Sequence, residues 1–232
     1  LIEKFGLDHD QLQFRRFRIA EAGYDSFLQE YPSEAEEAFI ASGRPVFDPV
    51  HLRHYKDSTA PPVATKEIEG ETFVNHTRGS LHLYKDIDDD MNYTIGVDVS
   101  SGIAGGDYSC CQVIDNNKNL VARWRGHLYP DALGDFVYHL AQFFNDAFVV
   151  VESNAHGILT VNTLHKIHGY QNVYTEKVRD KMTDTETVKL GFQTNVKTKT
   201  QVIDCLRSHI RDHEIEIPDR LTLDEMSTYA ID

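Results

Sequence analysis

The feature that most constrains the fold is a short apolar run near the middle of the chain. Residues 147–151 read Ala-Phe-Val-Val-Val, without a polar side chain. Because polar and apolar residues do not alternate, both faces of this segment must be covered by protein. A central strand with helices on both faces of its sheet meets that requirement. Apolar residues recur at helical spacing over 130–144 and 156–168, so we predict a helix on each side of this strand.

Three further strands are predicted before this run. Residues 93–99, 109–114 and 120–128 are rich in apolar side chains. The first two are separated by a glycine-rich stretch over 102–106, and the last two by the polar turn 115–119. Connections this short require antiparallel pairing, so these segments predict a three-stranded meander.

The order of the predicted elements defines a fold class. A short strand over 173–175 and a helix near 198–212 complete the order β-β-β-α-β-α-β-α. A meander followed by right-handed crossovers gives a five-stranded mixed sheet flanked by helices. This α/β arrangement is typical of the ribonuclease H-like fold.

The residues before this unit differ in pattern. Residues 1–50 predict two helices, the first capped by Asp8 and the second by a capping box at Ser33 and Glu36. Residues 51–91 contain a proline pair and an acidic run, and we interpret them as a linker. We therefore expect a separate domain over 92–232, and the initial leucine indicates that the chain begins within a longer product.

Composition limits the partners. The net charge of −14 excludes DNA binding by the overall field of the protein, although bound metal ions and a local basic patch would permit it. No apolar run reaches the ~20 residues of a membrane span, and no signal peptide is recognisable, so we expect neither a membrane protein nor a secreted one. Three cysteines give no disulfide framework and fit a reducing compartment.

Two carboxylates are the strongest candidates for chemistry. Asp98 interrupts an apolar strand, and Glu152 directly follows the apolar run. Parallel pairing of these strands would bring both side chains to the carboxyl edge of the sheet, where ligand sites of such folds lie. Carboxylate oxygens suit Mg²⁺ or Mn²⁺, and two such ions can activate water for phosphodiester cleavage. The alternative is that Asp98 is a turn former and Glu152 a solvated strand end.

Other candidate residues give weaker signals. Asp107 lies in the glycine-rich connection and is either a further metal ligand or a loop residue. Asn154 and His156 follow Glu152 closely and would support a ligand, or simply begin the next helix. The stretch 177–199 holds six basic and three acidic residues and is either a DNA-binding surface or a solvated loop. Its candidate phosphate-binding side chains are Arg179, Lys181, Lys189, Lys197 and Lys199.

Several stretches of the chain resemble the large terminase subunits of tailed bacteriophages. One is similar to the end of the motor domain of that family, and the others to successive motifs of its nuclease domain. In chain order the stretches are 29–43, 95–98, 105–109, 150–157, 190–195 and 198–199.

The resemblance implies a metal-dependent endonuclease that cuts concatemeric double-stranded viral DNA with two Mg²⁺ or Mn²⁺ ions. It implies that Asp98 and Glu152 are the first two ligands, and that residues 1–50 are the tail of an ATPase domain. The third acid of the family is an aspartate in a later pair, and the sequence reaches Asp232 before such a pair. Neither Asp224 nor Asp232 has the right context, so the resemblance implies an endonuclease whose ligand set is incomplete in this chain, which would lower or abolish its activity.

The resemblance also implies portal, procapsid and small terminase subunit as partners, in the host cytoplasm during viral assembly. Three alternatives stay open. One is a docking module of the packaging motor that does not catalyse; another is a resolvase or transposase of the same superfamily. The third is a sugar-kinase or actin-like ATPase, which would require a second domain for which this chain has no room. A G-x-x-x-x-G-K-[ST] phosphate loop is absent from the sequence.

Overall fold

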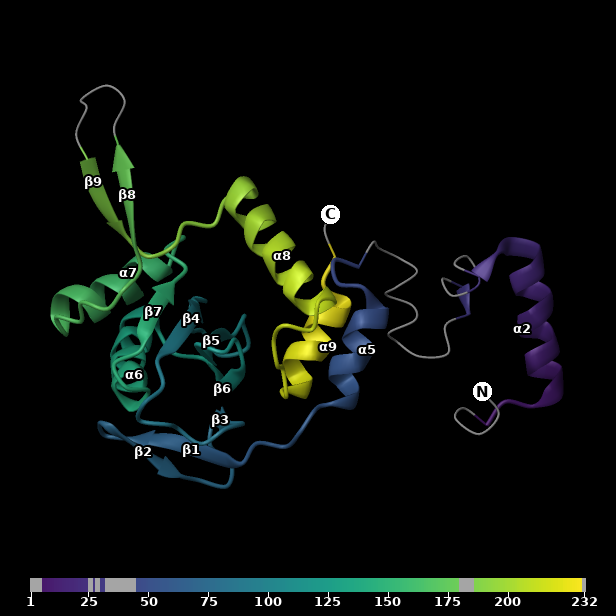
Figure 1. The fold of residues 1–232 in the computed structure, drawn as a ribbon, viewed down its shortest axis with the longest axis horizontal. Helices are drawn as coiled ribbons and strands as arrows, with labels where there is room; N and C mark the ends of the chain where they lie inside the picture. The colour runs from purple at the N-terminus through teal and green to yellow at the C-terminus, as the bar shows by residue number, and fades with distance from the viewer. Residues whose placement is uncertain (1–5, 25–26, 28–29, 32–44, 180–185, 231–232) are drawn as a thin grey trace. The chain divides into compact units, whose positions relative to one another are not determined.

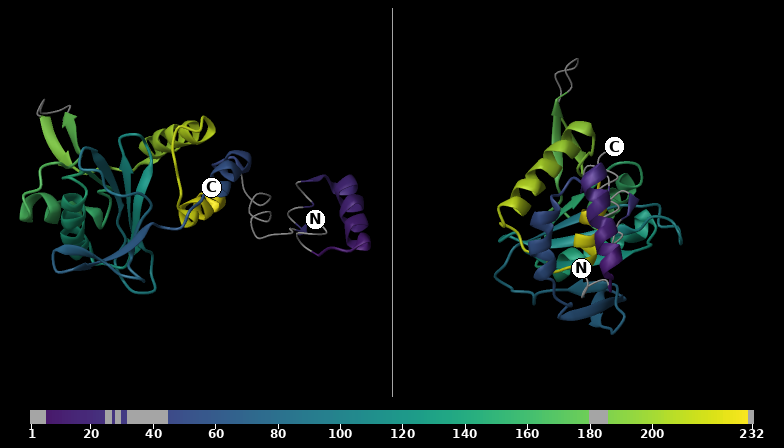
Figure 2. Two further views of the ribbon diagram at one scale, coloured as in Figure 1. Left: turned by 60° about the horizontal axis from the view of Figure 1, so that its bottom comes forward. Right: turned by 90° about the vertical axis from the view of Figure 1, so that its right-hand side faces the viewer.

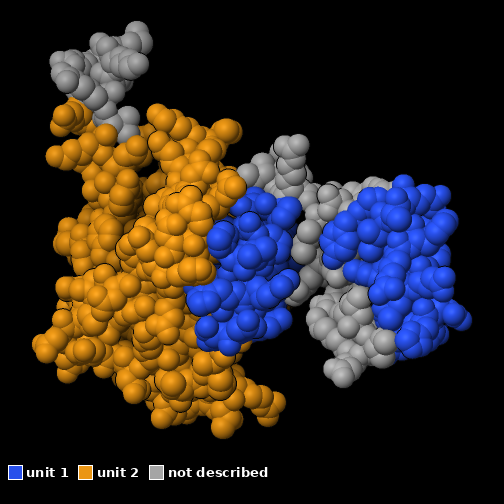
Figure 3. Space-filling view, turned by 45° about the vertical axis from the view of Figure 1, so that its right-hand side comes forward, with its two compact units in different colours: residues 1–58, 220–232 blue, residues 59–219 orange. Residues whose placement is uncertain are grey.

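The structure is a computed structural model that describes residues 6–24, 27, 30–31, 45–179 and 186–230. The chain forms two compact units (Figure 3), which comprise Leu1–Ser58 with Arg220–Asp232 and, separately, Thr59–Asp219. The predicted capping box at Ser33 and Glu36 lies outside the described residues. Within the described ranges, no helix combines the length and the apolar character needed to cross a membrane.

The first unit is helical, with α2 (His9–Ala22), α5 (Pro49–Asp57) and α9 (Arg220–Thr228). Asp8 caps helix α2, as predicted: the carboxylate of Asp8 accepts from the Gln11 amide at 2.8 Å, and the Gln11 side chain accepts from the Asp8 amide. In α9, Asp224 pairs with Arg220 at 3.0 Å and with Lys56 of α5 at 3.5 Å. Asp224 thus forms ion pairs with two cations within this unit.

The second unit is built on a seven-stranded mixed sheet of order β2-β1-β3-β6-β5-β4-β7 (Figure 1). The predicted meander is present, with β4 antiparallel to β5 and β5 antiparallel to β6. The segment predicted as a central strand forms β7, which pairs parallel with β4. It lies at the end of the strand order and not at its centre, with single bridges from Val149 to Val173 and from Glu152 to Phe192 on its other side. The strands are β1 (Ala64–Glu69), β2 (Thr72–Asn75), β3 (Leu81–Leu83), β4 (Tyr93–Asp98), β5 (Ser109–Asp115), β6 (Leu120–Gly126) and β7 (Phe148–Val151).

The strand count differs from the five predicted. Strands β1, β2 and β3 lie within the stretch interpreted as linker and extend the sheet from β6. They bring buried side chains such as Phe73 and Leu81 into the core, so they are part of the folded unit. The strand predicted over 173–175 is reduced to one bridge between Val173 and Val149. The division into motor-domain tail, linker and nuclease stays a prediction.

The chain then leaves the sheet as the two-stranded hairpin β8 (Thr175–Arg179) and β9 (Glu186–Leu190), which projects from the unit in Figures 1 and 2. After β9 it returns to the sheet edge, where Phe192 forms a parallel bridge with Glu152. The hairpin is thus anchored next to the carboxyl end of β7.

Helices cover the sheet. Helix α6 (Pro130–Phe143) presents Leu133, Val137 and Leu140, all fully buried, to the face of the sheet formed by residues such as Ile95 and Val149. Helix α7 (Gly157–Asn162) continues through a π-helical turn at Thr163–Ile167 and packs against α6. Helix α8 (Val196–Arg211) lies on the side of the sheet opposite α6 (Figures 1 and 2).

Candidate functional site

Asp98 and Glu152 meet at the carboxyl edge of the sheet. Alternation along β4 buries Ile95 and Val97 and directs Asp98 to the opposite face. The parallel register pairs Val97 with Val151, so Glu152 lies beside Asp98, and its amide donates to the Val97 carbonyl at 2.9 Å. The two carboxylates are close enough to share a hydrogen bond. The parallel register of β4 and β7 thus brings Asp98 and Glu152, which are far apart in the sequence, together as one acidic pair.

The electrostatics of this pair favour a cation. Asp98 as a residue is exposed, whereas its carboxylate is partly desolvated by burial. This desolvation, the Glu152 charge and, more weakly, the Asp107 charge raise the pKa of Asp98, while a backbone hydrogen bond from Val99 opposes them. Accumulated negative charge with oxygen donors is the environment in which Mg²⁺ or Mn²⁺ binds.

The donor set is small. Among the residues that the structure describes, no three His, Cys, Asp or Glu side chains gather closely enough to hold an ion. The site therefore offers the carboxylates of Asp98 and Glu152. Asp107 is exposed and contributes charge without completing a three-ligand group. Asp232 lies outside the described residues.

Asn154 holds Glu152 in place. Its side-chain amide donates to the Thr194 carbonyl at 2.8 Å and to Oε1 of Glu152 at 3.3 Å. The Ser153 amide donates to the Phe192 carbonyl at 2.9 Å. The carboxylate is thereby tied to the segment that follows β9. His156 is exposed and its side chain does not cap α7, so no described contact brings it to the pair.

The basic candidates lie on the hairpin and at the start of α8. Lys189 is exposed on β9 and lines a cavity of about 420 Å³ together with Ser153 and Gln193. Lys197 and Lys199 are exposed in the first turn of α8, which is capped by Asn195. The backbone of Arg179 ends β8, whereas its side chain and the whole of Lys181 lie outside the described residues.

Sequence reasoning assigned no role to Tyr108, Arg125 and His127, which the structure places on the same edge of the sheet. Arg125 is opposite Cys110, and Cys110 is opposite Asp98, across three neighbouring strands. Only the strand register reveals this relation, because Arg125 and Asp98 belong to different sequence motifs.

Replacing Asp98 by asparagine is expected to stabilise the metal-free protein at neutral pH by up to ~1 kcal/mol, the usual limit for a charge that water still screens. The raised pKa means that the folded state binds the Asp98 proton more tightly than the unfolded chain does. Ionising Asp98 therefore opposes folding at neutral pH, and this penalty disappears as the pH falls below the ordinary aspartate pKa. Urea unfolding of both proteins in EDTA, at about pH 7 and at about pH 4, measures the difference in their free energies of unfolding. A difference of the same size at both pH values would contradict the prediction.

The fold of this chain is similar to that of solved phage nucleases. The large terminase nuclease from thermophilic phage G20c superposes with a TM-score of 0.53 at 18% identity, over 79% of this chain and 80% of that chain. The same nuclease with bound cobalt superposes with a TM-score of 0.54 at 16% identity, over 77% of this chain and 80% of that chain. With bound magnesium the TM-score is 0.52 at 15% identity, over 76% of this chain and 78% of that chain.

No family model and no curated protein matches the sequence. The solved structures are 15–18% identical to this chain, and at this level the similarity establishes the fold alone. Any activity has to be argued from the residues of the site. The resemblance noted in the sequence is thus confirmed at the level of fold: the chain has the ribonuclease H-like α/β fold of the large terminase nucleases.

Proposed function

We propose that this chain is a metal-dependent endonuclease of a viral DNA-packaging terminase that cuts concatemeric double-stranded DNA. The observation that carries the proposal is the contact between the Asp98 and Glu152 carboxylates at the carboxyl edge of this fold. Support comes from the similar nuclease of phage G20c, which was solved with cobalt and with magnesium.

The residues divide the work as follows. Asp98 and Glu152 would hold Mg²⁺ or Mn²⁺, and Asn154 keeps the Glu152 carboxylate turned toward Asp98. Asp107 adds negative charge near the pair. When bound, two such ions supply the Lewis acidity for attack of water on a phosphodiester.

The same proposal covers the DNA and the partners. Lys189, Lys197 and Lys199, with Arg179 and Lys181, would hold the DNA backbone without reading its sequence. We assign residues 1–50 to the tail of a motor domain. The expected partners are the portal, the procapsid and the small terminase subunit, in the cytoplasm of an infected cell.

The proposal is tested by Mn²⁺ binding, which requires no turnover. Calorimetry and anomalous diffraction from Mn²⁺-soaked crystals should show an ion at Asp98 and Glu152 in the wild-type protein. Asp98→Asn and Glu152→Gln should each lose this ion. Asp89→Asn is the matched control, because Asp89 is an exposed acid that precedes β4, at the end of the strand remote from Asp98. Absence of binding, or binding that survives Asp98→Asn, would overturn the assignment.

One observation favours a second candidate, a packaging module that does not catalyse. The described residues place two acids together, and no group of three. Plasmid cleavage in Mn²⁺ separates the two candidates: nicking that Asp98→Asn abolishes supports the endonuclease. An intact plasmid, together with normal Mn²⁺ binding, supports the module.

A further inference from the structure

Four neighbouring strands place three charged residues and one cysteine in a row on one face of the sheet. Asp98 on β4 is opposite Cys110 on β5, and Cys110 is opposite Arg125 on β6. Glu152 continues the row on the other side of Asp98. Directly opposed residues share a face of the sheet, so Arg125 lies on the face of the acidic pair. Two strand spacings separate Asp98 from Arg125, or about 10 Å between their Cα atoms.

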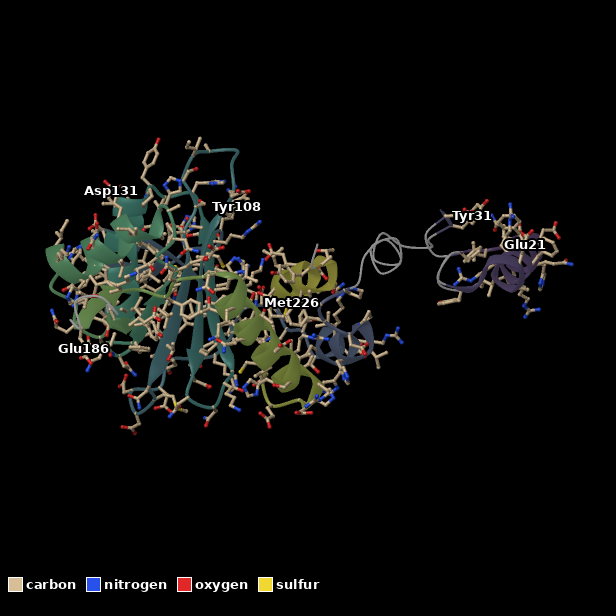
Figure 4. The ribbon with its side chains drawn as sticks, turned by 90° about the horizontal axis from the view of Figure 1, so that it is seen from above. Glu21, Tyr31, Tyr108, Asp131, Glu186 and Met226 are labelled. Carbon is tan, nitrogen blue, oxygen red and sulfur yellow. The ribbon has the colours of Figure 1, made fainter. Side chains whose placement is uncertain are left out.

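The Arg125 side chain is held by an aromatic stack. Its Cζ lies 3.8 Å from the centroid of the Tyr108 ring, and the centroid of the His127 ring lies 4.1 Å from the same point at an interplanar angle of 29°. The Arg125 guanidinium and the His127 ring cannot both lie that close on the same side of the Tyr108 ring. The Tyr108 ring therefore lies between them. Tyr108 is 45% exposed and lies at the surface of the unit (Figure 4).

This stack prepares the guanidinium for an anion. Arginine stays charged at all relevant pH values, and its N–H groups lie in the plane of the guanidinium. Stacking occupies the face of that plane, whereas phosphate oxygens are bound by its N–H edge. The rings of Tyr108 and His127 therefore fix the direction of the Arg125 edge without competing for it.

We propose that Arg125, held by Tyr108 and His127, binds a DNA phosphate beside the Asp98–Glu152 pair and positions the strand for cleavage. The inference rests on the proposed nuclease function and adds a positioning residue to it. Arg125 lies on the β6 side of the acidic pair, whereas Lys189 on the hairpin lies beyond β7. The backbone would thus be held on both sides of the acidic pair, which hairpin contacts alone would not achieve.

The test is the affinity of the full chain for a short fluorescein-labelled DNA duplex, measured by anisotropy in Ca²⁺ over a series of salt concentrations. Arg125→Ala should weaken binding about 5–10-fold and lower the slope of log K against log salt by about one. Arg125→Lys should recover part of the affinity, because it keeps the charge and loses the planar fork. Tyr108→Phe should bind like wild type, and Tyr108→Leu should resemble Arg125→Ala.

Arg211→Ala is the matched control, since it removes the same charge from an exposed residue that pairs with the adjacent Asp212 at 2.8 Å. Arg211 ends α8, and the residues after it pair with Lys118 in the β5–β6 turn, at the other end of the sheet. An Arg125→Ala effect no larger than that of Arg211→Ala would overturn the inference while leaving the nuclease intact. Equal affinities of Tyr108→Leu and Tyr108→Phe would overturn the role of the stack. A wild-type chain that neither binds nor cuts DNA would overturn the nuclease function and the inference together.

Discussion

Replacing Asp219 by alanine is expected to lower the free energy of unfolding by about 3–5 kcal/mol, the cost of leaving a buried charge without its partner. Nε of Arg123 lies 2.8 Å from Oδ2 of Asp219, and the two side chains are 9% and 4% exposed. The Tyr84 hydroxyl donates to the other oxygen of Asp219, and Nη2 of Arg123 lies 3.1 Å from Nδ1 of His82. Alanine would strand the guanidinium of Arg123 inside the protein.

Urea denaturation measures this loss. Trp124, the only tryptophan, follows Arg123 in β6 and is 3% exposed, so its fluorescence reports unfolding of the sheet at the relevant place. Glu214→Ala is a suitable comparison, because it breaks an exposed pair with Lys118 at 3.0 Å and should change stability far less. Similar losses in the two variants would show that burial does not determine the cost.

A double variant sharpens the test. Arg123→Met with Asp219→Leu removes both charges and keeps apolar volume, so it should recover most of the stability lost in Asp219→Ala. A double variant as unstable as the single one would mean that the hydrogen bonds of Tyr84 and His82, and not the uncompensated charge, dominate the loss. Burial and the Asp219 carboxylate raise the pKa of Tyr84, so its hydroxyl stays a donor at physiological pH.

This network was invisible in the sequence, and the reason is physical. Arg123 and Asp219 are 96 residues apart, and neither belongs to a periodic pattern. A charged residue inside an apolar strand indicates that a partner exists, but it does not identify the partner. By contrast, the meeting of Asp98 and Glu152 could be predicted, because both acids end apolar runs whose parallel pairing follows from the order of elements.

The short strands β1 to β3 mark another limit. Five of the six residues of β1 are half-buried without alternation, β2 has one buried residue, and a proline pair precedes these strands. Their role as strands depends on pairing with β6, which local sequence does not encode.

Register explains why Arg125 was missed. The pairing of β5 with β6 shifts at Val113 and Ile114, so counting back from the turn would put the wrong residue opposite Cys110. A change of one residue would move Arg125 to the other face of the sheet. The position of Glu152 beside Asp98 follows from the regular register of β4 and β7. The position of Arg125 on the same face depends on the irregular register of β5 and β6.

Gly157→Ala is expected to disturb stability and metal binding together. Gly157 begins α7, where its amide donates to the Asn154 carbonyl at 2.9 Å. A Cβ at this position would overlap the carbonyl oxygen of Glu152 and lie 2.8 Å from its carbonyl carbon. Both are backbone atoms, so either α7 or the Glu152 peptide has to move. The turn is already tight, since Ala155 within it has a φ of 41°.

We expect Gly157→Ala to lower stability by about 2 kcal/mol or more, as overpacking of a rigid contact does. Mn²⁺ affinity should fall about 10–100-fold, as when a group that orients a ligand is lost. Gly96→Ala is the control, because a Cβ on Gly96 would meet no atom within 4 Å although it is two residues from Asp98. Urea unfolding and calorimetry with Mn²⁺ apply to both variants. If Gly157→Ala loses stability but keeps Mn²⁺ affinity, the start of α7 moves and the Glu152 peptide does not. The hydrogen bonds of Glu152 with Val97 and Asn154 would then be stronger than the packing of α7 that is lost.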